Sequence, residues 1–134
     1  MQEQIGKTRW ASYNIAYHLV WIPKYRRKIL TSEIEAEMRR LTLDVCQKYD
    51  IVVLALEVQP DHVHLFVSAP PAKSPSNIVG LVKGYTSRYL REKFPKLTKL
   101  CGKSQLWSKS YYVGTAGEVS SEVILRYINE CQTS

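Results

Sequence analysis

Apolar and polar residues alternate along several stretches of the chain in the two-residue rhythm of β-strands. The segment from Tyr13 to Trp21 is rich in aromatic and aliphatic residues and predicts a strand that stops at Pro23. Two further runs, Val52 to Val58 and His62 to Ser68, are separated by three residues, which is typical of a hairpin. A short fourth strand is expected from Tyr111 to Thr115.

Two other segments place apolar residues at the three- and four-residue spacing of an α-helix. The first covers residues 33–49 and begins behind Ser32, which forms a capping box with Glu35 three residues later. The second begins after Ser74, which is suited to cap a helix. It ends before Pro95, because a proline disfavours the helical conformation in the residue that precedes it.

The rest of the chain is predicted to hold a basic loop over residues 96–109 and a last helix. This helix starts at Ser120 or Ser121 and carries Tyr127. The predicted order is therefore β, α, β, β, α, β, with an extra C-terminal helix. This order indicates the α+β class and a ferredoxin-like split βαβ sandwich, an antiparallel sheet with two helices on one face. We expect a single domain over residues 1–134, and because many activities share this fold, the fold does not name the function.

The charge of the chain is compatible with a nucleic-acid partner, but it equally describes a basic surface with no specific partner. Nineteen Lys and Arg residues against twelve Asp and Glu leave a formal net charge of +7 on 134 residues, which attracts polyanions. No apolar stretch reaches the ~20 residues of a transmembrane helix, and the polar N-terminus lacks the apolar run of a secretory signal. The three cysteines form no Cys-x-x-Cys pair, which disfavours a structural zinc site and a disulfide framework. We therefore expect a cytoplasmic protein with no membrane partner.

His62 and His64 are the candidates for metal binding. Alternate side chains of a strand share one face, so both imidazoles should lie with Phe66, while Val63 and Leu65 face the helices. Two imidazoles at this spacing can direct ring nitrogens at one divalent cation and leave positions open for water and a phosphate oxygen. The same pattern also occurs as two hydrogen-bonded histidines on a half-exposed strand, so the pair by itself leaves both interpretations open.

Tyr127 is the candidate nucleophile. A tyrosine can attack a DNA phosphodiester and form a phosphotyrosine, which conserves the energy of the bond for rejoining. Its reference pKa of about 10 makes it a weak nucleophile at neutral pH, and a metal ion that stabilises the charge of the transition state would compensate. Tyr127 also lies between Ile124 and Ile128 in an apolar stripe, so the pattern alone equally describes a core residue.

Four separated segments carry a resemblance to a known family. They are YHLVWIPKYR at residues 17–26, PDHVHL at 60–65, LWSKSYYV at 106–113 and RYI at 126–128. In this order they make the chain resemble the TnpA-type transposases of small insertion sequences, the IS200-like family. These are the single-tyrosine members of the HUH superfamily, and the motif of two histidines around a hydrophobic residue is matched here by His62, Val63 and His64.

The resemblance implies a metal-dependent enzyme that cleaves and rejoins single-stranded DNA at the ends of an insertion sequence. It implies that His62 and His64 bind the metal and that Tyr127 is the nucleophile, so that cleavage leaves a 5′-phosphotyrosine and a free 3′-hydroxyl group. It also implies DNA hairpins as the recognised ends and a homodimer in which the tyrosine helix of one subunit completes the partner's active site. Mg²⁺ is the expected cofactor, with Mn²⁺ as a substitute, since both suit mixed imidazole and oxygen sites.

The third metal ligand stays open. Members of the family often carry a glutamine four residues after the tyrosine, where it binds the metal. Here that position is Cys131, and Gln132 comes one residue later. At ~100° per residue, Gln132 would lie ~140° away from Tyr127 around a regular helix. Cys131, Gln132, Asp61 and water are therefore all candidates.

A set of basic side chains is predicted to contact DNA. Most lie in the run that follows the first strand or on the second long helix, where phosphate contacts would position the strand. The set consists of Lys24, Arg26, Arg27, Lys83, Arg88, Arg91 and Lys109. Unpaired bases are expected to stack on residues such as Tyr25 or Trp107.

Three other functions fit parts of the pattern. A non-catalytic nucleic-acid-binding module of the same fold would explain the charge but not the histidine pair or Tyr127. A metal-dependent phosphodiesterase that uses water would keep His62 and His64, and would stay active when Tyr127 is replaced by phenylalanine. A replication or conjugation nickase of the same superfamily is disfavoured by the short chain.

Overall fold

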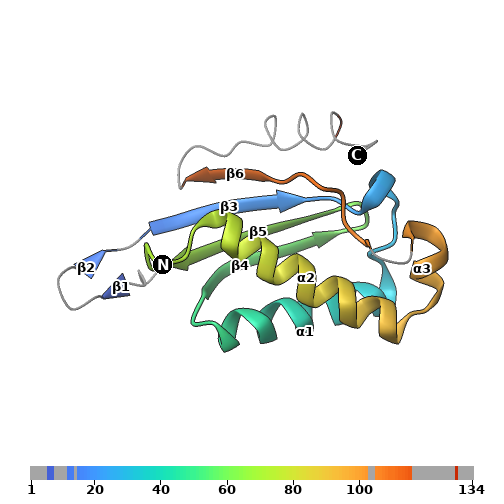
Figure 1. Ribbon diagram of the computed structural model, residues 1–134, viewed down its shortest axis with the longest axis horizontal. Coiled ribbons are helices and arrows are strands. Elements are labelled where there is room, and N and C mark those ends of the chain that lie inside the picture. Colours follow the sequence, from blue (N-terminus) through green and yellow to red (C-terminus); the bar gives the residue numbers. More distant parts are fainter. Residues whose placement is uncertain (1–5, 8–11, 14, 103–104, 116–128, 130–134) are drawn as a thin grey trace.

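A four-stranded antiparallel sheet lies at the centre of the protein (Figure 1). The structure, a computed structural model, describes residues 6–7, 12–13, 15–102, 105–115 and 129. The strands of the sheet are β3 (Ile15–Trp21), β4 (Val52–Gln59), β5 (His62–Ala69) and β6 (Tyr112–Thr115). Their order across the sheet is β4-β5-β3-β6. Two short strands, β1 (Gly6–Lys7) and β2 (Ser12–Tyr13), pair with each other apart from this sheet.

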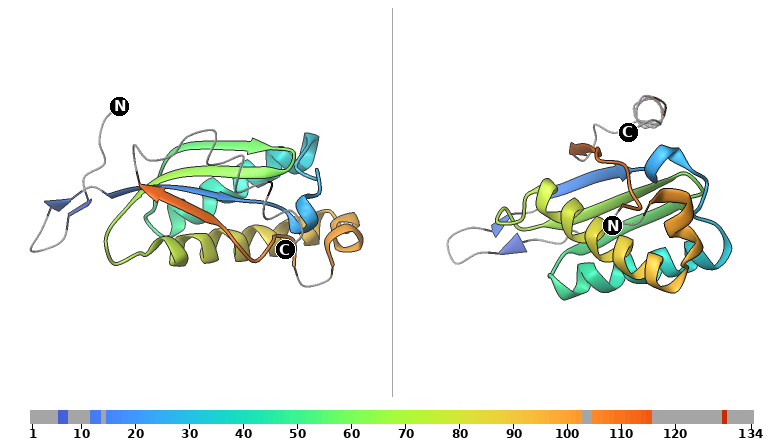
Figure 2. Two further views of the ribbon diagram at one scale, coloured as in Figure 1. Left: turned by 90° about the horizontal axis from the view of Figure 1, so that it is seen from above. Right: turned by 45° about the vertical axis from the view of Figure 1, so that its right-hand side comes forward.

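The two long helices cover one face of the sheet (Figure 1, Figure 2). The first, α1 (Ser32–Lys48), links β3 to β4, and the second, α2 (Pro75–Lys93), links β5 to β6. Each helix thus joins two strands that have another strand between them in the sheet. This is the split βαβ arrangement, so the predicted α+β, ferredoxin-like class is confirmed.

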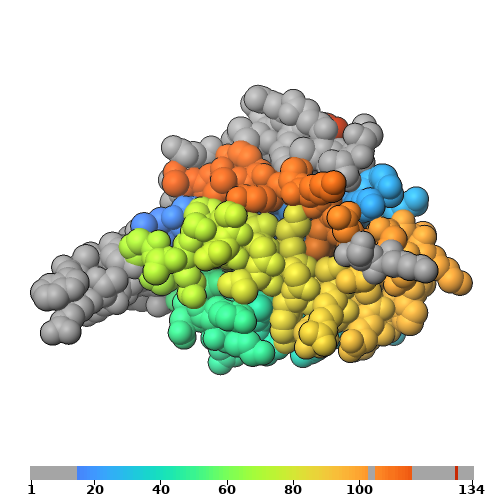
Figure 3. All heavy atoms as spheres, in the orientation of Figure 1, coloured from blue at the N-terminus to red at the C-terminus, as the bar shows by residue number. Residues whose placement is uncertain are grey.

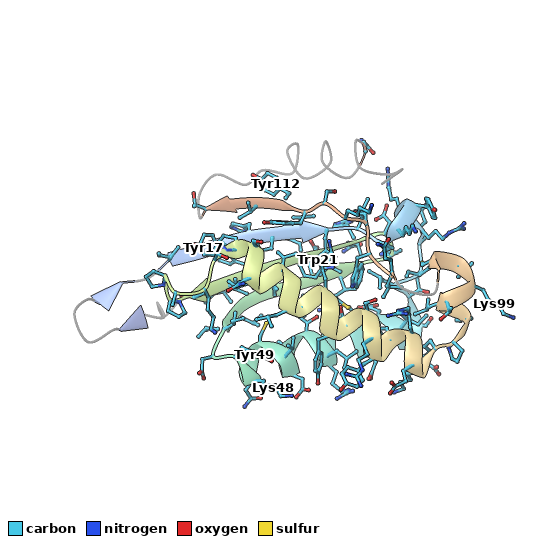
Figure 4. All side chains as sticks on the ribbon, viewed as in Figure 1. Tyr17, Trp21, Lys48, Tyr49, Lys99 and Tyr112 are labelled. Atoms are coloured by element: carbon cyan, nitrogen blue, oxygen red, sulfur yellow. The ribbon has the colours of Figure 1, made fainter. Side chains whose placement is uncertain are left out.

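The hydrophobic core lies between the sheet and the two helices. Val63, Leu65 and Val67 of β5 are fully buried there, because alternate side chains of a strand share one face. Trp21 of β3 lies between the sheet and α2 (Figure 4), and its ring meets Trp107 in a T-shaped contact with ring centroids 6.1 Å apart. Burial of each of the three aliphatic side chains of β5 stabilises the fold by roughly 1.5–3 kcal/mol. The outer side of this layer is formed by α1 and α2, which lie side by side in Figure 3.

The predicted capping box at the start of α1 is wrong. The helix begins one residue earlier than the capping box requires, so Thr31 is the N-cap and Ser32 is already the first helical residue. Within the described residues the Thr31 side chain makes no capping hydrogen bond. Glu35 is displaced to the fourth helical position, where its carboxylate accepts a hydrogen bond from Arg39 Nε at 3.0 Å, one turn further on.

The predicted start of α2 is confirmed. The hydroxyl oxygen of Ser74 accepts a hydrogen bond from the backbone N–H of Asn77 at 3.1 Å, and Pro75 occupies the first helical turn. The helix ends at Lys93, before Pro95, as expected. A proline at the first turn loses nothing, because the N–H that it lacks would have no partner within the helix.

The predicted loop over residues 96–109 is wrong in its first part, which forms the short helix α3 (Lys96–Cys101). Pro95 takes a helical backbone conformation in front of it, and the Pro95 carbonyl accepts a hydrogen bond from the N–H of Thr98. Leu97 and Cys101, four residues apart, are both buried. One helical turn brings these two side chains to the same side, which is why the segment does not stay extended.

The predicted C-terminal helix falls on residues 116–128 and 130–134, which lie outside the described residues. Tyr127, Cys131 and Gln132 belong to this part of the chain, so their roles stay predictions. Of the described cysteines, Cys46 and Cys101 are buried free thiols. None of the described helices is long and apolar enough to cross a lipid bilayer.

Candidate functional site

The β4–β5 hairpin places an aspartate directly against the first histidine of the pair. Gln59 and His62 face each other across the hairpin, so Pro60 and Asp61 form a two-residue turn. The tight turn brings the Asp61 Oδ1 atom to 3.0 Å from the His62 Nδ1 atom. The side chains are 15% and 17% exposed, respectively, so water competes only weakly for this hydrogen bond.

His64 has a different partner, His18 on the neighbouring strand β3. The Nδ1 atom of His18 lies 2.9 Å from the Nε2 atom of His64. The His18 ring is also stacked on Phe66, with centroids 4.1 Å apart and planes 8° apart. The register explains this cluster, because His18 stands opposite Phe66 and Val20 stands opposite His64. His18 was not among the predicted site residues, although the first and third strands of a split βαβ sheet are always neighbours.

The electrostatics of the hairpin fix the proton on His62. Burial alone would raise the pKa of Asp61, but hydrogen bonds from Arg26 and His62 outweigh burial and hold the pKa below its usual range. Asp61 is therefore an ionised carboxylate at neutral pH, which can only accept hydrogen bonds. The His62 Nδ1 atom must carry the proton that it donates, and in the neutral imidazole Nε2 keeps its lone pair.

The pKa values of His64 and His18 favour the neutral form of both imidazoles. Burial lowers the pKa of His64, and the neighbouring His18 and His62 lower it further, while Glu57 acts in the opposite direction. Burial likewise lowers the pKa of His18. A neutral imidazole is the form that binds a metal ion, because the binding nitrogen must offer a lone pair.

Arg26 extends the hairpin contacts to the C-terminal part of the chain. Its Nε atom donates to Asp61 Oδ2 at 2.9 Å, and its Nη1 atom donates to Asn129 Oδ1 at 2.8 Å. The residues Lys24–Arg26 form one turn of 3₁₀ helix after β3, in which Tyr25 has φ 60° and Arg26 has φ 53°. Two successive non-glycine residues in this left-handed region are uncommon and cost on the order of 1 kcal/mol or more each.

The residues present fit a divalent cation as far as the structure describes them. No described residue bonds the Nε2 atom of His62 or the Nδ1 atom of His64, so each imidazole keeps one nitrogen for a ligand role. Among the described residues no three His, Cys, Asp or Glu side chains are grouped closely enough to hold a metal ion. Both carboxylate oxygens of Asp61, one of the candidates for the third ligand, are engaged by Arg26 and His62.

The structure separates the predicted DNA contacts into three places. Arg26 contacts Asp61 in the hairpin turn. Its exposed neighbour Arg27 and Lys24 lie over the Tyr25 ring, with the guanidinium group 5.8 Å and the ammonium group 5.3 Å from the ring centre. Arg88 lies on the opposite side of the molecule, in a groove between α1 and α2 that also contains Lys48 and Tyr49.

Of the remaining three, Lys83 and Lys109 line a hollow where α2 meets the segment before β6, and Arg91 lies further along α2. The Lys83 ammonium group donates to the carbonyls of Ser108 and Ser110 at 2.7 and 3.1 Å, and burial lowers its pKa to about 8. Arg91 Nε donates to the Ser87 carbonyl one turn earlier, at 3.1 Å. Lys109 is exposed. Lys83 therefore holds two segments together, and its contact with DNA stays a prediction.

Comparison with known proteins gives the family. The fold and the paired histidines define a small α+β domain with a candidate metal site on the sheet face opposite the helices. The family model described as "Transposase IS200 like" matches residues 11–131. The chain belongs to the IS200-like transposase family and is a transposase of this family.

Individual relatives agree with this assignment. The ISDra2 transposase TnpA of Deinococcus radiodurans is 32% identical over 125 residues, which cover 93% of this chain and 89% of the relative. The transposase of insertion sequence IS200 from Salmonella typhimurium is 30% identical over 122 residues, 91% of this chain and 78% of the relative. A crystal structure of a transposase-like protein from Deinococcus radiodurans R1 superposes with a TM-score of 0.88 at 32% identity, covering 96% of this chain and 99% of that one.

A more distant structure shares the fold. It is a REP-associated tyrosine transposase bound to a REP hairpin, with a TM-score of 0.56 at 14% identity, covering 93% of this chain and 70% of that chain. At this level of identity the likeness concerns the arrangement of the sheet and helices. The split βαβ sheet described above therefore also occurs in this protein.

Proposed function

We propose that this transposase cleaves and rejoins single-stranded DNA at the ends of an insertion sequence, with Tyr127 as the nucleophile and a divalent cation, Mg²⁺ or Mn²⁺, as cofactor. One observation carries the proposal: His62 and His64 alternate along β5 on the face opposite the helices, each with one ring nitrogen that no described residue bonds. Bound at these nitrogens, the cation would supply positive charge that polarises the scissile phosphate.

The chain's own residues prepare this site without the metal. Asp61 holds His62 in the tautomer whose Nε2 atom has a lone pair, and the lowered pKa of His64 keeps that imidazole neutral. The His18 ring, stacked on Phe66, fixes the orientation of His64 from the neighbouring strand. Both ligands are therefore oriented before any ion binds.

The proposed strand cleavage is a transfer of one phosphoryl group. The Tyr127 hydroxyl oxygen attacks the phosphorus atom, forms the new O–P bond and loses its proton to solvent. The bond from phosphorus to the 3′-oxygen breaks, and this oxygen takes up a proton to become a 3′-hydroxyl group. In rejoining, a 3′-hydroxyl group attacks the phosphotyrosine and releases Tyr127. One P–O bond forms and one breaks in each step, so no external energy source is needed.

Two features beside the histidines support single-stranded DNA as the substrate. Tyr25 is 51% exposed, and Lys24 and the Arg27 guanidinium group lie 5.3 and 5.8 Å from the centre of its ring. An exposed ring flanked by two cations suits an unpaired base next to its phosphates. The REP-associated tyrosine transposase, which shares the fold and is bound to a REP hairpin, supports hairpin ends as the recognised form.

A covalent-adduct assay tests the proposal. Single-stranded oligonucleotides from the element's ends, labelled at the 5′ or the 3′ end, are incubated with the wild type and with Tyr127→Phe, in Mg²⁺ or in EDTA. We expect DNA to become attached to the wild type in Mg²⁺ only. The attached fragment is the one with the 5′-phosphate, so the adduct should carry the 3′ label and not the 5′ label. Tyr127→Phe should form no adduct, while circular dichroism shows an unchanged fold.

The same assay separates the alternatives. Metal-dependent cutting that survives Tyr127→Phe would make water the nucleophile and the protein a phosphodiesterase. Binding without cutting in any metal would leave a nucleic-acid-binding module. Light scattering on the eluted protein, with and without DNA, tests the homodimer that the family resemblance implies.

A further inference from the structure

We propose that the hollow beside Lys83 binds one backbone phosphate of the single-stranded DNA, with Lys83, Ser108 and Lys109 as hydrogen-bond donors. The inference rests on the proposed function, because the DNA is the substrate assigned there. The hollow takes no part in the cleavage chemistry. It contributes to DNA affinity and not to the reaction at phosphorus, which is assigned to the histidine pair.

The Lys83 hollow has α2 on one side and the segment before β6 on the other, two parts of the chain that meet in Figure 3. Its volume is about 220 Å³. Lys83 and Ser87 are one helical turn apart and so share a face of α2. The polar side chains that line the hollow are Lys83, Ser87, Gln105, Ser108 and Lys109.

The wall opposite α2 is held in place without a ligand. The Trp107 indole is 4% exposed, and its Nε1 atom donates to Thr86 Oγ1 on α2 at 3.1 Å. The backbone N–H of Ser108 donates to the Ile22 carbonyl at 2.9 Å, which ties the same segment to the residue after β3. The donors of the hollow are therefore arranged before a phosphate arrives, which reduces the ordering that binding requires.

Lys83 is a buried cation without a counter-ion. Its ammonium group has three N–H donors, and two of them are used by the carbonyls of Ser108 and Ser110. The described residues that line the hollow include no Asp or Glu, and no described carboxylate pairs with Lys83 or Lys109. Burial lowers the pKa of Lys83 to about 8, because no negative charge offsets the loss of solvation. A phosphate would supply this charge and accept from the third N–H.

The two serines add neutral donors. Ser108 Oγ is buried and has no hydrogen-bond partner among the described residues, which is uncommon for a buried hydroxyl. A serine has one side-chain torsion with three staggered positions, so the hydroxyl can turn toward a ligand in the hollow. Ser87 Oγ accepts from Arg91 Nε at 3.2 Å, and its own hydrogen stays available for donation.

The chemistry of the hollow favours a phosphate over a base. Ammonium and hydroxyl groups suit the oxygens of an anion, whereas the buried ring of Trp107 offers no face for a base to stack on. The hollow also adjoins the turn with the exposed Tyr25 ring, because the Lys24 N–H donates to the carbonyl of Leu106, which lines the hollow. An unpaired base on Tyr25 and a phosphate in the Lys83 hollow can therefore belong to one strand.

Two variants test the hollow without breaking the contacts of Lys83 to the backbone. Ser108→Ala removes the hydroxyl that has no partner, and Lys109→Gln removes the exposed charge. Ser76→Ala and Lys99→Gln are the matched controls at exposed positions, and Lys99 points away from the body of the protein in Figure 4. Thermal melts should show Ser108→Ala at least as stable as the wild type, because it loses a buried hydroxyl that makes no hydrogen bond.

Inorganic phosphate probes the hollow alone. The metal-free protein is titrated in EDTA with sodium phosphate, or with sodium chloride at equal ionic strength, and followed by ¹H–¹⁵N NMR. We expect the amide signals of Ser108 and Lys109 and the Trp107 indole signal to shift with phosphate only. The dissociation constant should be about 10-fold higher in Ser108→Ala, because a hydrogen bond to a charged group is lost, and unchanged in the two controls.

A second titration uses DNA, again in EDTA so that the metal site does not contribute. Fluorescence anisotropy gives the affinity for a single-stranded oligonucleotide from the element's end at several salt concentrations. Ser108→Ala should weaken binding about 10-fold without a change of the salt slope, since a neutral hydroxyl releases no counterion. Lys109→Gln should reduce the slope by about 0.7, and Lys99→Gln should leave it unchanged.

Two further comparisons show whether the groups act together and where. Because Ser108 and Lys109 contact one phosphate, the double variant should lose less affinity than the product of the two single losses. At saturating DNA and Mg²⁺, Ser108→Ala should form the covalent adduct at the wild-type rate, because a contact away from the reacting phosphate affects binding only.

The outcomes separate this inference from the proposed function. If Ser108→Ala equals the wild type in both titrations, the inference is wrong, whatever the adduct assay shows. If inorganic phosphate binds in the hollow but the DNA affinity of Ser108→Ala is unchanged, the hollow takes a free phosphate compound and DNA is overturned as its ligand. If the wild type forms no adduct but both titrations give the expected results, the proposed cleavage is refuted and the phosphate site is supported.

Discussion

At the scale of single residues, each histidine on the sheet face opposite the helices is held by a different neighbour. His62 is held by Asp61, His64 by His18, and His18 by its stack on Phe66. If His64 offers its Nδ1 atom to a metal, its Nε2 atom carries the proton and donates to the Nδ1 atom of His18. His18 then orients a ligand from the adjacent strand, in the way that Asp61 orients the other one.

Replacing His18 tests this role directly. His18→Phe keeps an aromatic ring on Phe66 but removes the acceptor for His64, so we expect Mn²⁺ binding about 10-fold weaker with little loss of thermal stability. His18→Asn, whose side-chain oxygen can occupy a place close to that of Nδ1, should recover part of the affinity. Calorimetry measures both variants. Wild-type affinity in His18→Phe would show that His64 needs no partner.

Lys83 shows a second residue-scale effect, the burial of a charged amine. Its ammonium group donates to two backbone carbonyls, and burial lowers its pKa to about 8. In the unfolded chain a lysine keeps a pKa of about 10.4. Between these two values the unfolded chain binds more protons than the folded protein, so this residue makes stability rise with pH. The neutral amine still has two N–H groups for the two carbonyls.

We therefore expect a specific alkaline stabilisation. From pH 8 to pH 10 the unfolding free energy of the wild type should gain on the order of 1–2 kcal/mol relative to Lys83→Met, after allowance for solvent screening. Urea titrations at several pH values measure the difference. Lys28→Met, at an exposed position, is the matched control, and its unfolding free energy should change with pH in the same way as that of the wild type. A constant difference between wild type and Lys83→Met would contradict the lowered pKa.

At the scale of elements, the two long helices begin in different ways although each has a serine near its start. Ser74 caps α2 through its side chain, whereas Ser32 is the first residue inside α1 and has φ 51°. Ser74→Ala should lower the unfolding free energy by ~1 kcal/mol, and Ser32→Ala should change it by less than ~0.5 kcal/mol, because alanine suffers the same steric penalty there. Urea unfolding measures both variants. A larger loss of unfolding free energy in Ser32→Ala would show that the Ser32 side chain caps α1 after all.

Periodicity predicted most of the elements because it reflects burial. The alternation from His62 to Ser68 reappears as β5 with its buried valines and leucine, and Ser74 starts α2 as expected. Features set by one or two residues were missed. The predicted strand at Tyr13 is divided between β2 and β3, and the lysine-rich character of residues 96–101 concealed the two buried positions of α3.

The candidate site could be predicted only in part, for a related reason. His62 and His64 are neighbours along one strand, so alternation alone places them together. The contact between Arg26 and Asp61 joins residues 35 positions apart through a turn with two positive φ values, and no pattern in the sequence indicates such a turn at Tyr25. The position of His18 beside the histidine pair follows from the strand order. The predicted topology contained this order, but His18 was not placed with it.

At the scale of the whole molecule, the sheet divides the basic side chains between two sides. Arg27 directly follows Arg26, whose guanidinium group contacts Asp61 in the hairpin turn, whereas Arg88 lines the groove between α1 and α2. The two helices cover the face of the sheet opposite the histidines (Figure 2). A single strand that passes the histidine pair can therefore reach Arg27 but is separated from Arg88 by the thickness of the domain. The two arginines, both among the predicted DNA contacts, should differ in their effect.

The salt dependence of DNA binding measures this difference. Each phosphate contact with a single strand contributes about 0.7 to the slope of log affinity against log salt concentration, because a counterion is released. Arg27→Ala should therefore weaken binding of a single-stranded oligonucleotide and reduce the slope by about 0.7. Arg88→Ala removes the same charge and should leave the slope unchanged, which makes it the matched control. Fluorescence anisotropy from 50 to 300 mM salt, roughly the range over which such contacts weaken, gives both slopes. A reduced slope in Arg88→Ala alone would place the DNA on the helical side and separate the binding surface from the histidine pair.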